Sequence, residues 1–262
     1  MNRIEELFKR KKERILNIYC TAGFPHLDSA IEVMKALQES GADMIELGIP
    51  YSDPLADGPV IQQSSSVALI NGMTIKKLFE QLKDLRKSPS FGGVGEVIPV
   101  LLMGYMNPVL QYGFEKFCSD AAAVGIDGLI FPDLPEYEFE NEYGSIIKKY
   151  GLDFVFLVTP ETSNERIGKL DELSSGFLYA VSSSSTTGSD KNMNNVEQYL
   201  EKLENLQLKN PVLVGFGIKD KTTFEAACRH ASGAIIGSAY IKALEKSADI
   251  ASDTRTFLSS VL

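Results

Sequence analysis

The stretch Ile15–Gly48, ILNIYCTAGFPHLDSAIEVMKALQESGADMIELG, joins two short apolar runs through a helix-length amphipathic segment. The runs are Ile15–Cys20 and Ala42–Gly48, and both have the length and apolar content of buried strands. Between them, Leu27–Ser40 carries apolar residues on one side at helical spacing and ends at Gly41, a residue type that often terminates helices. The order strand, helix, strand predicts a unit whose two strands are parallel.

The same alternation continues to the end of the chain. Further strands are predicted at Val97–Met103, Asp127–Phe131, Asp153–Val158, Phe177–Val181, Val212–Gly215 and Ala234–Ile236. Further helices are predicted at Ile75–Lys87, Phe114–Val124, Glu136–Tyr150, Glu165–Leu173, Val196–Leu206 and Thr222–His230. Eight strands alternating with at least eight helices in 262 residues fit a (β/α)8 barrel, the TIM-barrel architecture, which typically takes about 250 residues. A doubly wound open sheet is the alternative, but residues 21–25, TAGFP, lack the Gly-rich dinucleotide turn that such a sheet would need.

We therefore expect an α/β chain that forms a single (β/α)8 barrel domain over residues 1–262. The N-terminal segment MNRIEELFKRKKERI has apolar residues near helical spacing and predicts an extra helix lying on the domain. Two connections are longer than their helices require: Ile49–Ile61 after the second strand and Ser182–Asn194 after the sixth. Both follow strands, so both belong to the carboxyl-terminal face, where barrel active sites are built. A third insertion, Ser88–Glu96, precedes a strand and falls on the opposite face.

The composition disfavours several classes of function. Lysine and arginine number 26 against 35 aspartates and glutamates, and this net charge of −9 disfavours a nucleic-acid or anionic-membrane surface. The longest apolar stretch, Val97–Met106, is too short to span a bilayer, and the N-terminus lacks the apolar core of a secretory signal. The three cysteines and two histidines have no metal-ligand or redox-motif spacing. These features predict a cytoplasmic protein without bound metal.

Glu46 is the first candidate for chemistry. Side chains alternate along a strand, so Ile45, Leu47 and Ile49 share an apolar face that meets the helices, and Glu46 points into the barrel. A carboxylate at the catalytic end of a strand is desolvated, which raises its pKa toward the range useful for proton transfer. The alternative is a glutamate satisfied by a buried hydrogen bond or ion pair, with no chemical role.

The loop that follows this strand supplies two more carboxylates. Three prolines restrict it, and Asp53 and Asp57 are residues of a type that commonly forms turns. Asp57 could also fold back over the barrel mouth, which would pair it with Glu46 and divide acid and base roles between two carboxyl groups.

Glycine turns near the end of the chain predict an anion site. Gly215–Ile218 and Ile236–Ala239 each follow a strand and open a helix, where backbone amides favour negative charge. In barrels, the loops after the seventh and eighth strands commonly bind phosphate. Helix capping is the simpler explanation of such turns.

Tyr179, on the sixth strand, fits either face of its strand, and an ordinary core tyrosine is its default interpretation.

These residues also resemble those of a known family. The run Ala42–Pro59, ADMIELGIPYSDPLADGP, closely resembles the signature of the tryptophan synthase α chain family. Shorter motifs that fall in that family's order and spacing are Thr21–Gly23, Phe131–Pro135, Thr187–Gly188, Gly215–Ile218 and Gly237–Ala239. The resemblance covers essentially the whole chain, and its first segment is highly specific.

The resemblance implies a lyase of tryptophan biosynthesis that cleaves indole-3-glycerol phosphate, by a retro-aldol reaction, into indole and glyceraldehyde 3-phosphate. It implies that Glu46 is the general acid–base, that Asp57 holds the indole N–H, and that Tyr179 supports Glu46 and the substrate. The substrate-binding positions that it implies are Tyr19, Leu102 and Ile130 around the indole, Gly188, Gly217, Gly237 and Ser238 around the phosphate, and Thr187 and Phe216 without a more specific role.

The resemblance also implies a partner. Family α chains work with a β chain that uses pyridoxal phosphate and receives indole through an internal tunnel, in an α2β2 assembly. Asp53 and the segments around Asn107 and Pro135 would face that partner. The α chain itself would need no cofactor, since a carboxylate pair and a phosphate anchor account for the reaction.

Two other functions remain open on the sequence. Another phosphate-binding barrel, such as a sugar-phosphate isomerase or epimerase, would share the glycine turns, but Glu46 followed by Asp57 in a Pro-rich loop argues against it. A catalytically silent barrel that only activates a β partner would be marked by the loss of a carboxylate. Both carboxylates are present, and the all-serine segment 182–185 keeps this alternative open.

Overall fold

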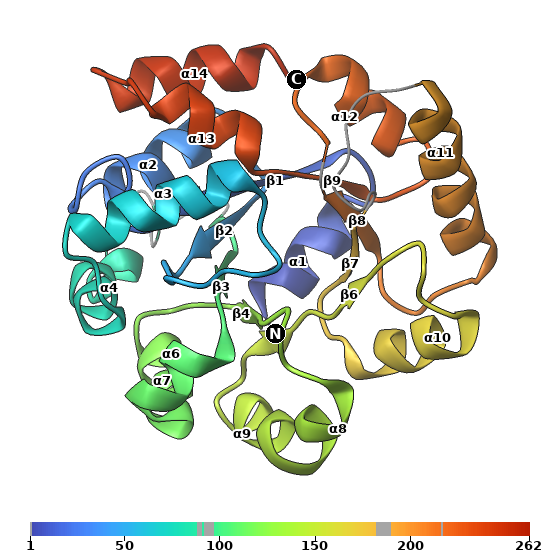
Figure 1. The fold of residues 1–262 in the computed structure, drawn as a ribbon, viewed down its shortest axis with the longest axis horizontal. Coiled ribbons are helices and arrows are strands. Elements are labelled where there is room, and N and C mark those ends of the chain that lie inside the picture. The colour runs from blue at the N-terminus through green and yellow to red at the C-terminus, as the bar shows by residue number, and fades with distance from the viewer. Residues whose placement is uncertain (1, 88–90, 92–96, 182–189, 216) are drawn as a thin grey trace.

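The computed structural model describes residues 2–87, 91, 97–181, 190–215 and 217–262. Within them, parallel strands form one sheet that curls into a ring, and helices surround the ring (Figure 1). The strands are β1 Ile15–Thr21, β2 Met44–Gly48, β3 Val100–Met103, β4 Gly128–Ile130, β5 Asp153–Phe154, β6 Leu157–Val158, β7 Leu178–Val181, β8 Val212–Gly215 and β9 Gly233–Ile236.

The ring closes through the segment that was predicted as the fifth strand, Asp153–Val158. The sheet order is β5-β4-β3-β2-β1-β9-β8-β7-β6, and its two outermost members, β5 and β6, are the two halves of this segment. Between them, Val155 donates its N–H to the Leu129 carbonyl at 3.0 Å, and Tyr179 donates its N–H to the Phe156 carbonyl at 3.0 Å. The segment thus bridges β4 and β7, and the predicted (β/α)8 barrel is confirmed with its fifth strand in two pieces.

The helices follow the predicted order with several differences. They are α1 Arg3–Arg10, α2 Ala30–Glu39, α3 Pro59–Ile70, α4 Ile75–Leu82, η1 Leu85–Lys87, α6 Met106–Tyr112, α7 Phe114–Ala123, α8 Glu136–Glu138, η2 Phe139–Tyr143, α9 Gly144–Lys149, α10 Asn164–Leu173, α11 Asp190–Asn205, α12 Lys221–Ala227, α13 Ser238–Leu244 and α14 Ile250–Ser259. The predicted helix Glu136–Tyr150 is divided among α8, η2 and α9. The sequence analysis missed α3, α6 and α14.

The two expected long connections differ in outcome. The loop after β2 ends at Gly58, because Pro59 begins α3 with the ring geometry that favours a first helical turn. The connection expected at Ser182–Asn194 overlaps α11, which begins at Asp190, and its residues 182–189 lie outside the described residues. The insertion expected at Ser88–Glu96 also lies outside them, apart from Phe91.

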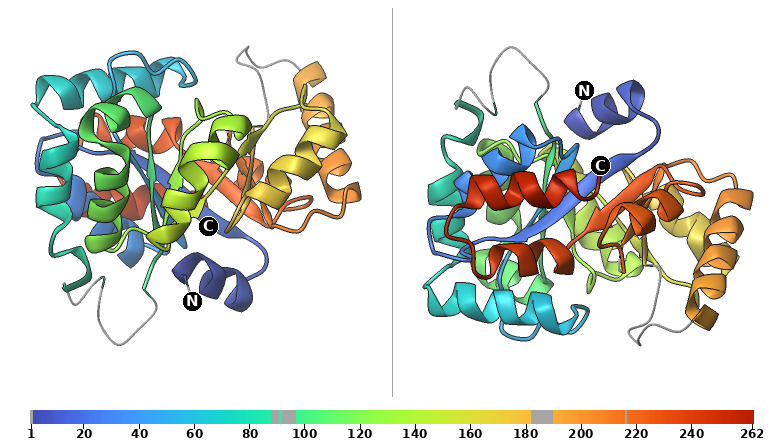
Figure 2. Two further views of the ribbon diagram at one scale, coloured as in Figure 1. Left: turned by 90° about the horizontal axis from the view of Figure 1, so that it is seen from below. Right: turned by 90° about the horizontal axis from the view of Figure 1, so that it is seen from above.

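The predicted N-terminal helix is α1, which lies against one end of the barrel (Figure 2). Asn2 caps it by accepting the Ile4 N–H, and Ile4 and Leu7 on its apolar face are buried. Ile4 reaches the strands so closely that a Cβ at Gly128 or at Gly176 would meet its side chain at 3.3 Å or 3.0 Å. The helix therefore closes the amino-terminal end of the barrel, and the opposite end remains for a site.

The register decides which side chains face the interior. Tyr19 on β1 lies beside Glu46 on β2, and Glu46 lies beside Leu101 on β3. Side chains at paired positions of parallel strands share a face, so these three occupy one side of the sheet. Met103, two residues along β3, lines the cavity described below, and this places all of them inside the barrel.

Candidate active site

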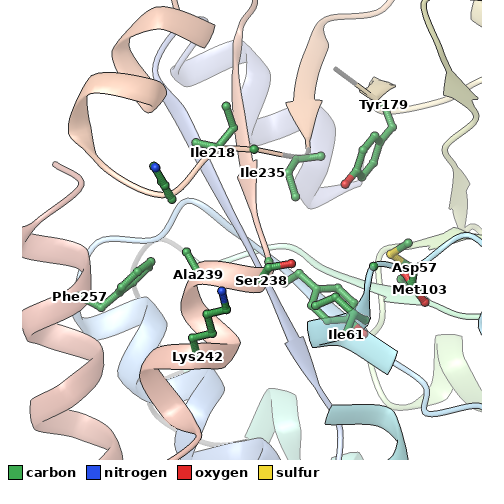
Figure 3. Close-up of a pocket in the computed structure, with 15 residues that line it drawn as sticks. Asp57, Ile61, Met103, Tyr179, Ile218, Ile235, Ser238, Ala239, Lys242 and Phe257 are labelled. Carbon is green, nitrogen blue, oxygen red and sulfur yellow. The ribbon is translucent and has the colours of Figure 1, made fainter. Parts of the chain in front are cut away.

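A cavity of about 520 Å³ lies at the carboxyl ends of the strands. Its lining comes from the strands β1, β3, β7 and β9, from the end of the β2 loop and α3, from the segments after β8 and β9, and from α14 (Figure 3). The lining residues are Tyr19, Asp57, Gly58, Ile61, Met103, Tyr179, Gly217, Ile218, Lys219, Ile235, Gly237, Ser238, Ala239, Lys242 and Phe257. The cavity therefore joins the carboxylate loop to the two glycine turns.

Glu46 lies in the barrel interior beside Tyr19. Its side chain is fully buried, and the Asn17 amide donates a hydrogen bond of 2.6 Å to its Oε1. In the part of the chain that the structure describes, its other oxygen, Oε2, has no hydrogen-bond partner. Burial raises the pKa of Glu46 to about 8, and the Asn17 hydrogen bond offsets part of that rise. Near neutral pH the carboxyl is therefore mostly protonated and can act as an acid.

Asp57 reaches the cavity from the loop after β2. The Tyr105 hydroxyl donates a hydrogen bond of 2.9 Å to its Oδ2, and the same hydroxyl accepts the Ala56 N–H at 3.0 Å. Burial raises the pKa of Asp57 to about 6, and the bond from Tyr105 opposes the rise. The site thus holds one carboxyl that is mostly protonated at neutral pH and one that is mostly ionised.

Two tyrosines lie near these carboxyl groups, at the cavity. Tyr19 and Tyr179 both line it, which settles the face of Tyr179 that the sequence left open. Each tip lies over a glycine, because a Cβ at Gly48 would collide with the Tyr19 hydroxyl and one at Gly215 with that of Tyr179. Burial, together with the nearby carboxyl groups, raises the pKa of both phenols, so both remain neutral donors.

The far end of the cavity has the features of an anion site. Gly217 has φ of 79°, a conformation that favours glycine, and Gly237 and Ser238 stand where α13 begins. Two lysines that the sequence analysis missed, Lys219 and Lys242, line the same cavity. Their distance in sequence from the glycine turns could have indicated them, because Lys219 follows Gly217 by two residues and Lys242 lies one helical turn after Ser238.

Among the described residues, three of the predicted catalytic and substrate-binding residues are not in the cavity lining: Glu46, Leu102 and Ile130. Leu102 pairs in register with Leu47, so it lies on the helix-facing side of β3, and Met103 lines the cavity in its place. The physical reason is the alternation of side chains along the strand. Ile130 pairs with Met103 and shares the interior face, where it is fully buried, but it is not among the lining residues.

The residues predicted to face a partner lie on three segments that follow β2, β3 and β4: a loop, the helix α6 and the residue before α8. Asp53 is exposed in the first, where its carboxylate accepts the Ser52 hydroxyl. The amide N–H of Asn107 donates a hydrogen bond of 2.9 Å to the Tyr51 hydroxyl, which ties α6 to the loop after β2. Pro135 precedes α8 in the third. The carboxyl ends of neighbouring strands bring these segments to one rim.

Three predicted binding residues, Thr187, Gly188 and Phe216, lie outside the described residues. Within the described part, no three His, Cys, Asp or Glu side chains gather in a way that could hold a metal ion. In the same residues, no helix has both the length and the apolar character that crossing a membrane requires.

Comparisons with known proteins agree with this geometry. The family model described as tryptophan synthase alpha chain matches residues 6–260. A tryptophan synthase alpha chain from Flavobacterium johnsoniae is 52% identical over 248 residues, which cover 94% of this chain and 95% of the relative. One from Bacteroides thetaiotaomicron is 48% identical, with 95% of both chains covered.

Solved structures give the same result for the fold. The crystal structure of tryptophan synthase subunit alpha from Legionella pneumophila superposes with a TM-score of 0.87 at 34% identity, over 100% of this chain and 97% of that one. A tryptophan synthase structure from M. tuberculosis gives a TM-score of 0.84 at 30% identity, over 100% and 98% of the two chains. With a family match over nearly the whole length and a barrel that carries Glu46 in its interior and Asp57 at its cavity, the chain belongs to the tryptophan synthase alpha chain family.

Proposed function

We propose that the chain, as one (β/α)8 domain over residues 1–262, cleaves indole-3-glycerol phosphate to indole and glyceraldehyde 3-phosphate. The observation that carries this proposal is a pair of carboxyl groups, Asp57 in the cavity lining and Glu46 beside the lining residue Tyr19, with pKa values of about 6 and about 8. A retro-aldol cleavage of this substrate needs an acid and a fixed negative charge at neutral pH, and the pair supplies one of each.

Glu46 carries the protons in this mechanism. Its protonated Oε2 gives a proton to C3 of the indole ring, and the Asp57 carboxylate accepts the ring N–H and stabilises the positive charge that develops. The Glu46 carboxylate then takes the proton of the side-chain hydroxyl. As the aldehyde forms, the bond between C3 and the side chain breaks, and its electron pair returns to the ring. Glu46 ends protonated, as it began, so no outside proton source is consumed.

The phosphate anchor follows from the far end of the cavity. The backbone amides near Gly217, Gly237 and Ser238 can approach a phosphate closely, and Lys219 and Lys242 add positive charge at the same end. An aspartate in place of Gly237 would put a negative charge there. We expect Gly237→Asp to weaken glycerol phosphate binding at least tenfold, measured by calorimetry, and unchanged binding would place the anchor elsewhere.

The proposal includes a β-chain partner in an α2β2 assembly in the cytoplasm. The segments after β2, β3 and β4, which carry Asp53, Asn107 and Pro135, also expose large apolar side chains. These are Leu55, Leu110 and Tyr137, exposed by 92%, 47% and 70%. Apolar side chains gathered at one rim are typical of a protein interface. Pyridoxal phosphate would belong to the partner, and no cofactor is assigned to this chain.

The test is indole release from indole-3-glycerol phosphate by the purified chain, with and without a tryptophan synthase β chain. We expect slow release alone and much faster release with the partner. Release that the partner does not accelerate would contradict the assembly but not the chemistry. If the folded protein releases no indole in either condition, the catalytic proposal is wrong, and a silent activator of the β chain or a barrel for another phosphate substrate takes its place.

A further inference from the structure

Asn17 is a polar side chain in an unusual place. It lies in the middle of β1, between Leu16 and Ile18, and all three residues are fully buried. Asn17 is two residues before Tyr19, so its side chain faces the barrel interior. There its amide nitrogen lies 2.6 Å from Oε1 of Glu46, on the neighbouring strand.

Stability alone does not account for this amide. A buried amide costs free energy for each polar atom left without a partner. Among the described residues, Oδ1 of Asn17 has no hydrogen-bond partner, although the nitrogen donates to Glu46. An apolar side chain such as valine would fill a β-strand position without that cost. The amide therefore has its clearest use in its bond to Glu46.

We propose that Asn17 is a positioning residue, whose amide fixes Oε1 of Glu46 and thereby leaves Oε2 as the oxygen that exchanges protons with the substrate. The inference rests on the proposed function, since it assigns the orientation of the group that carries the protons there. It also explains why the two oxygens of one carboxyl differ, with one bonded and the other without a partner. A carboxyl held at one oxygen cannot rotate freely, which keeps the second oxygen in place for the reaction.

Among the groups around Glu46, the Asn17 amide is the one that counteracts the effect of burial on the pKa of Glu46. Tyr19 and Cys20 on β1 and Tyr179 on β7 interact with Glu46 electrostatically, and Asp57 in the loop after β2 is the other carboxyl group of the site. The first three have raised pKa values and stay neutral near neutral pH, and Asp57 is an anion that cannot stabilise a second one. The Asn17 N–H is the interaction that lowers the pKa of Glu46.

The experiment compares Asn17→Val with the wild type in single-substrate kinetics across pH 6 to 10. Valine removes the donor and suits a buried strand. We expect kcat to fall about 10- to 100-fold, as for a lost hydrogen bond to a charged group, with KM changed less than about threefold. Because the donor that favours the carboxylate is gone, the alkaline limb of kcat/KM moves to higher pH.

A second variant guards against a folding defect. Asn17→Asp keeps the shape of the side chain but sets a carboxyl beside Glu46, so the two share one proton and release it at a still higher pH. We expect its alkaline limb to shift further than that of the valine variant. Thr254→Val is the matched control, since it removes a buried hydrogen bond, 2.8 Å to the Tyr240 hydroxyl, away from the cavity. It is expected to leave the pH profile unchanged.

The outcomes separate this inference from the proposed function. If the wild type releases indole but both Asn17 variants keep its kcat and alkaline limb, the positioning role is wrong and the catalytic proposal stands. If kcat falls while the limbs stay in place in both variants, Asn17 is only structural. If the folded wild type releases no indole, with or without the β chain, the proposed function itself fails.

Discussion

The two ends of the barrel each bury a carboxylate, and they treat it in opposite ways. At the amino end, the Asp127 carboxylate pairs with the guanidinium groups of Arg3 at 2.7 Å and Arg86 at 2.8 Å. It also accepts a hydrogen bond of 2.8 Å from the Val100 N–H. At the carboxyl end, Glu46 receives one neutral donor and keeps one oxygen without a partner in the described part of the chain. Both side chains are almost fully excluded from solvent.

The difference teaches how burial can serve structure or chemistry. A buried carboxylate that accepts hydrogen bonds from cations and N–H donors holds its neighbours together. Arg86, for example, ties Asp127 to the carbonyls of Gly125 and Ile98. A buried carboxyl with few partners has a raised pKa and a free oxygen, and beside a cavity it can transfer a proton. Partner count and cavity together distinguish the two roles.

The largest expected effect is at the carboxyl end. Glu46→Gln keeps the shape and the Asn17 contact region but cannot exchange a proton, so we expect kcat to fall at least about a thousandfold. Glycerol phosphate affinity and the urea midpoint of unfolding should stay close to those of the wild type. Near wild-type turnover in this variant would break the comparison, because both carboxylates would then be structural.

The next effect is at the amino end and falls on stability. Arg86→Ala leaves Asp127 buried with one cation fewer and frees two carbonyls, so we expect a loss of about 3 kcal/mol in the free energy of unfolding. Where the variant is folded, kcat should be unchanged. Lys35→Ala, which breaks an exposed pair with Glu39, is the matched control and should change stability by less than about 1 kcal/mol. Equal losses in both variants would contradict the structural role of Asp127.

The pH profile sharpens the comparison at the carboxyl end. Asp57 must be ionised and Glu46 protonated, so kcat/KM should fall below about pH 6 and above about pH 8, tenfold for each further unit. In Asp57→Asn, the fall of kcat/KM at acid pH that is due to Asp57 should disappear. Any fall that remains at acid pH in this variant is due to protonation of the substrate phosphate. A flat wild-type profile from pH 5 to 9 would refute the division of roles.

The smallest effect concerns a third buried carboxyl, Asp153 on β5. Its Oδ2 has no partner among the described residues, and burial raises its pKa to about 6, but it does not line the cavity. Its folded-state pKa is above that of an unfolded aspartate, so stability falls as pH rises from about 4 to 6, and the cost is complete above that. We expect Asp153→Asn to stabilise the fold by about 1–2 kcal/mol at pH 8 and less at pH 5, with kcat unchanged. A variant less stable at pH 8 would show that the ionised form has unrecognised partners.

Much of the fold and part of the site could be predicted, since both depend on local patterns. Alternation along Ala42–Ile49 placed Glu46 inside the barrel, and its register beside Tyr19 agrees. The same rule, applied to the third strand, would have placed Met103 rather than Leu102 on the interior face. Pro59 likewise signalled the start of α3, since proline favours the first helical turn.

The partners of the carboxyl groups could not be predicted, because they come from distant parts of the chain. Asn17 bonds to Glu46 across 29 residues and Tyr105 to Asp57 across 48. Such contacts depend on how strands are placed next to one another, and no local spacing encodes that. The lysines of the cavity lie close to the glycine turns in sequence, but helix exteriors also carry many lysines, so their location needed the fold.

The pairing of β1 with both β2 and β9 has a consequence for biosynthesis. Of the strands described, β1 is synthesised first, and its neighbour β2 follows soon after it. The other edge of β1 stays unpaired until β9, Gly233–Ile236, has been synthesised. Until then the nascent sheet has an open edge, whose unpaired backbone groups can capture other chains. A truncation that removes β9 would make that edge permanent. Chaperones that shield nascent chains would therefore be needed longest at β1, the strand made first.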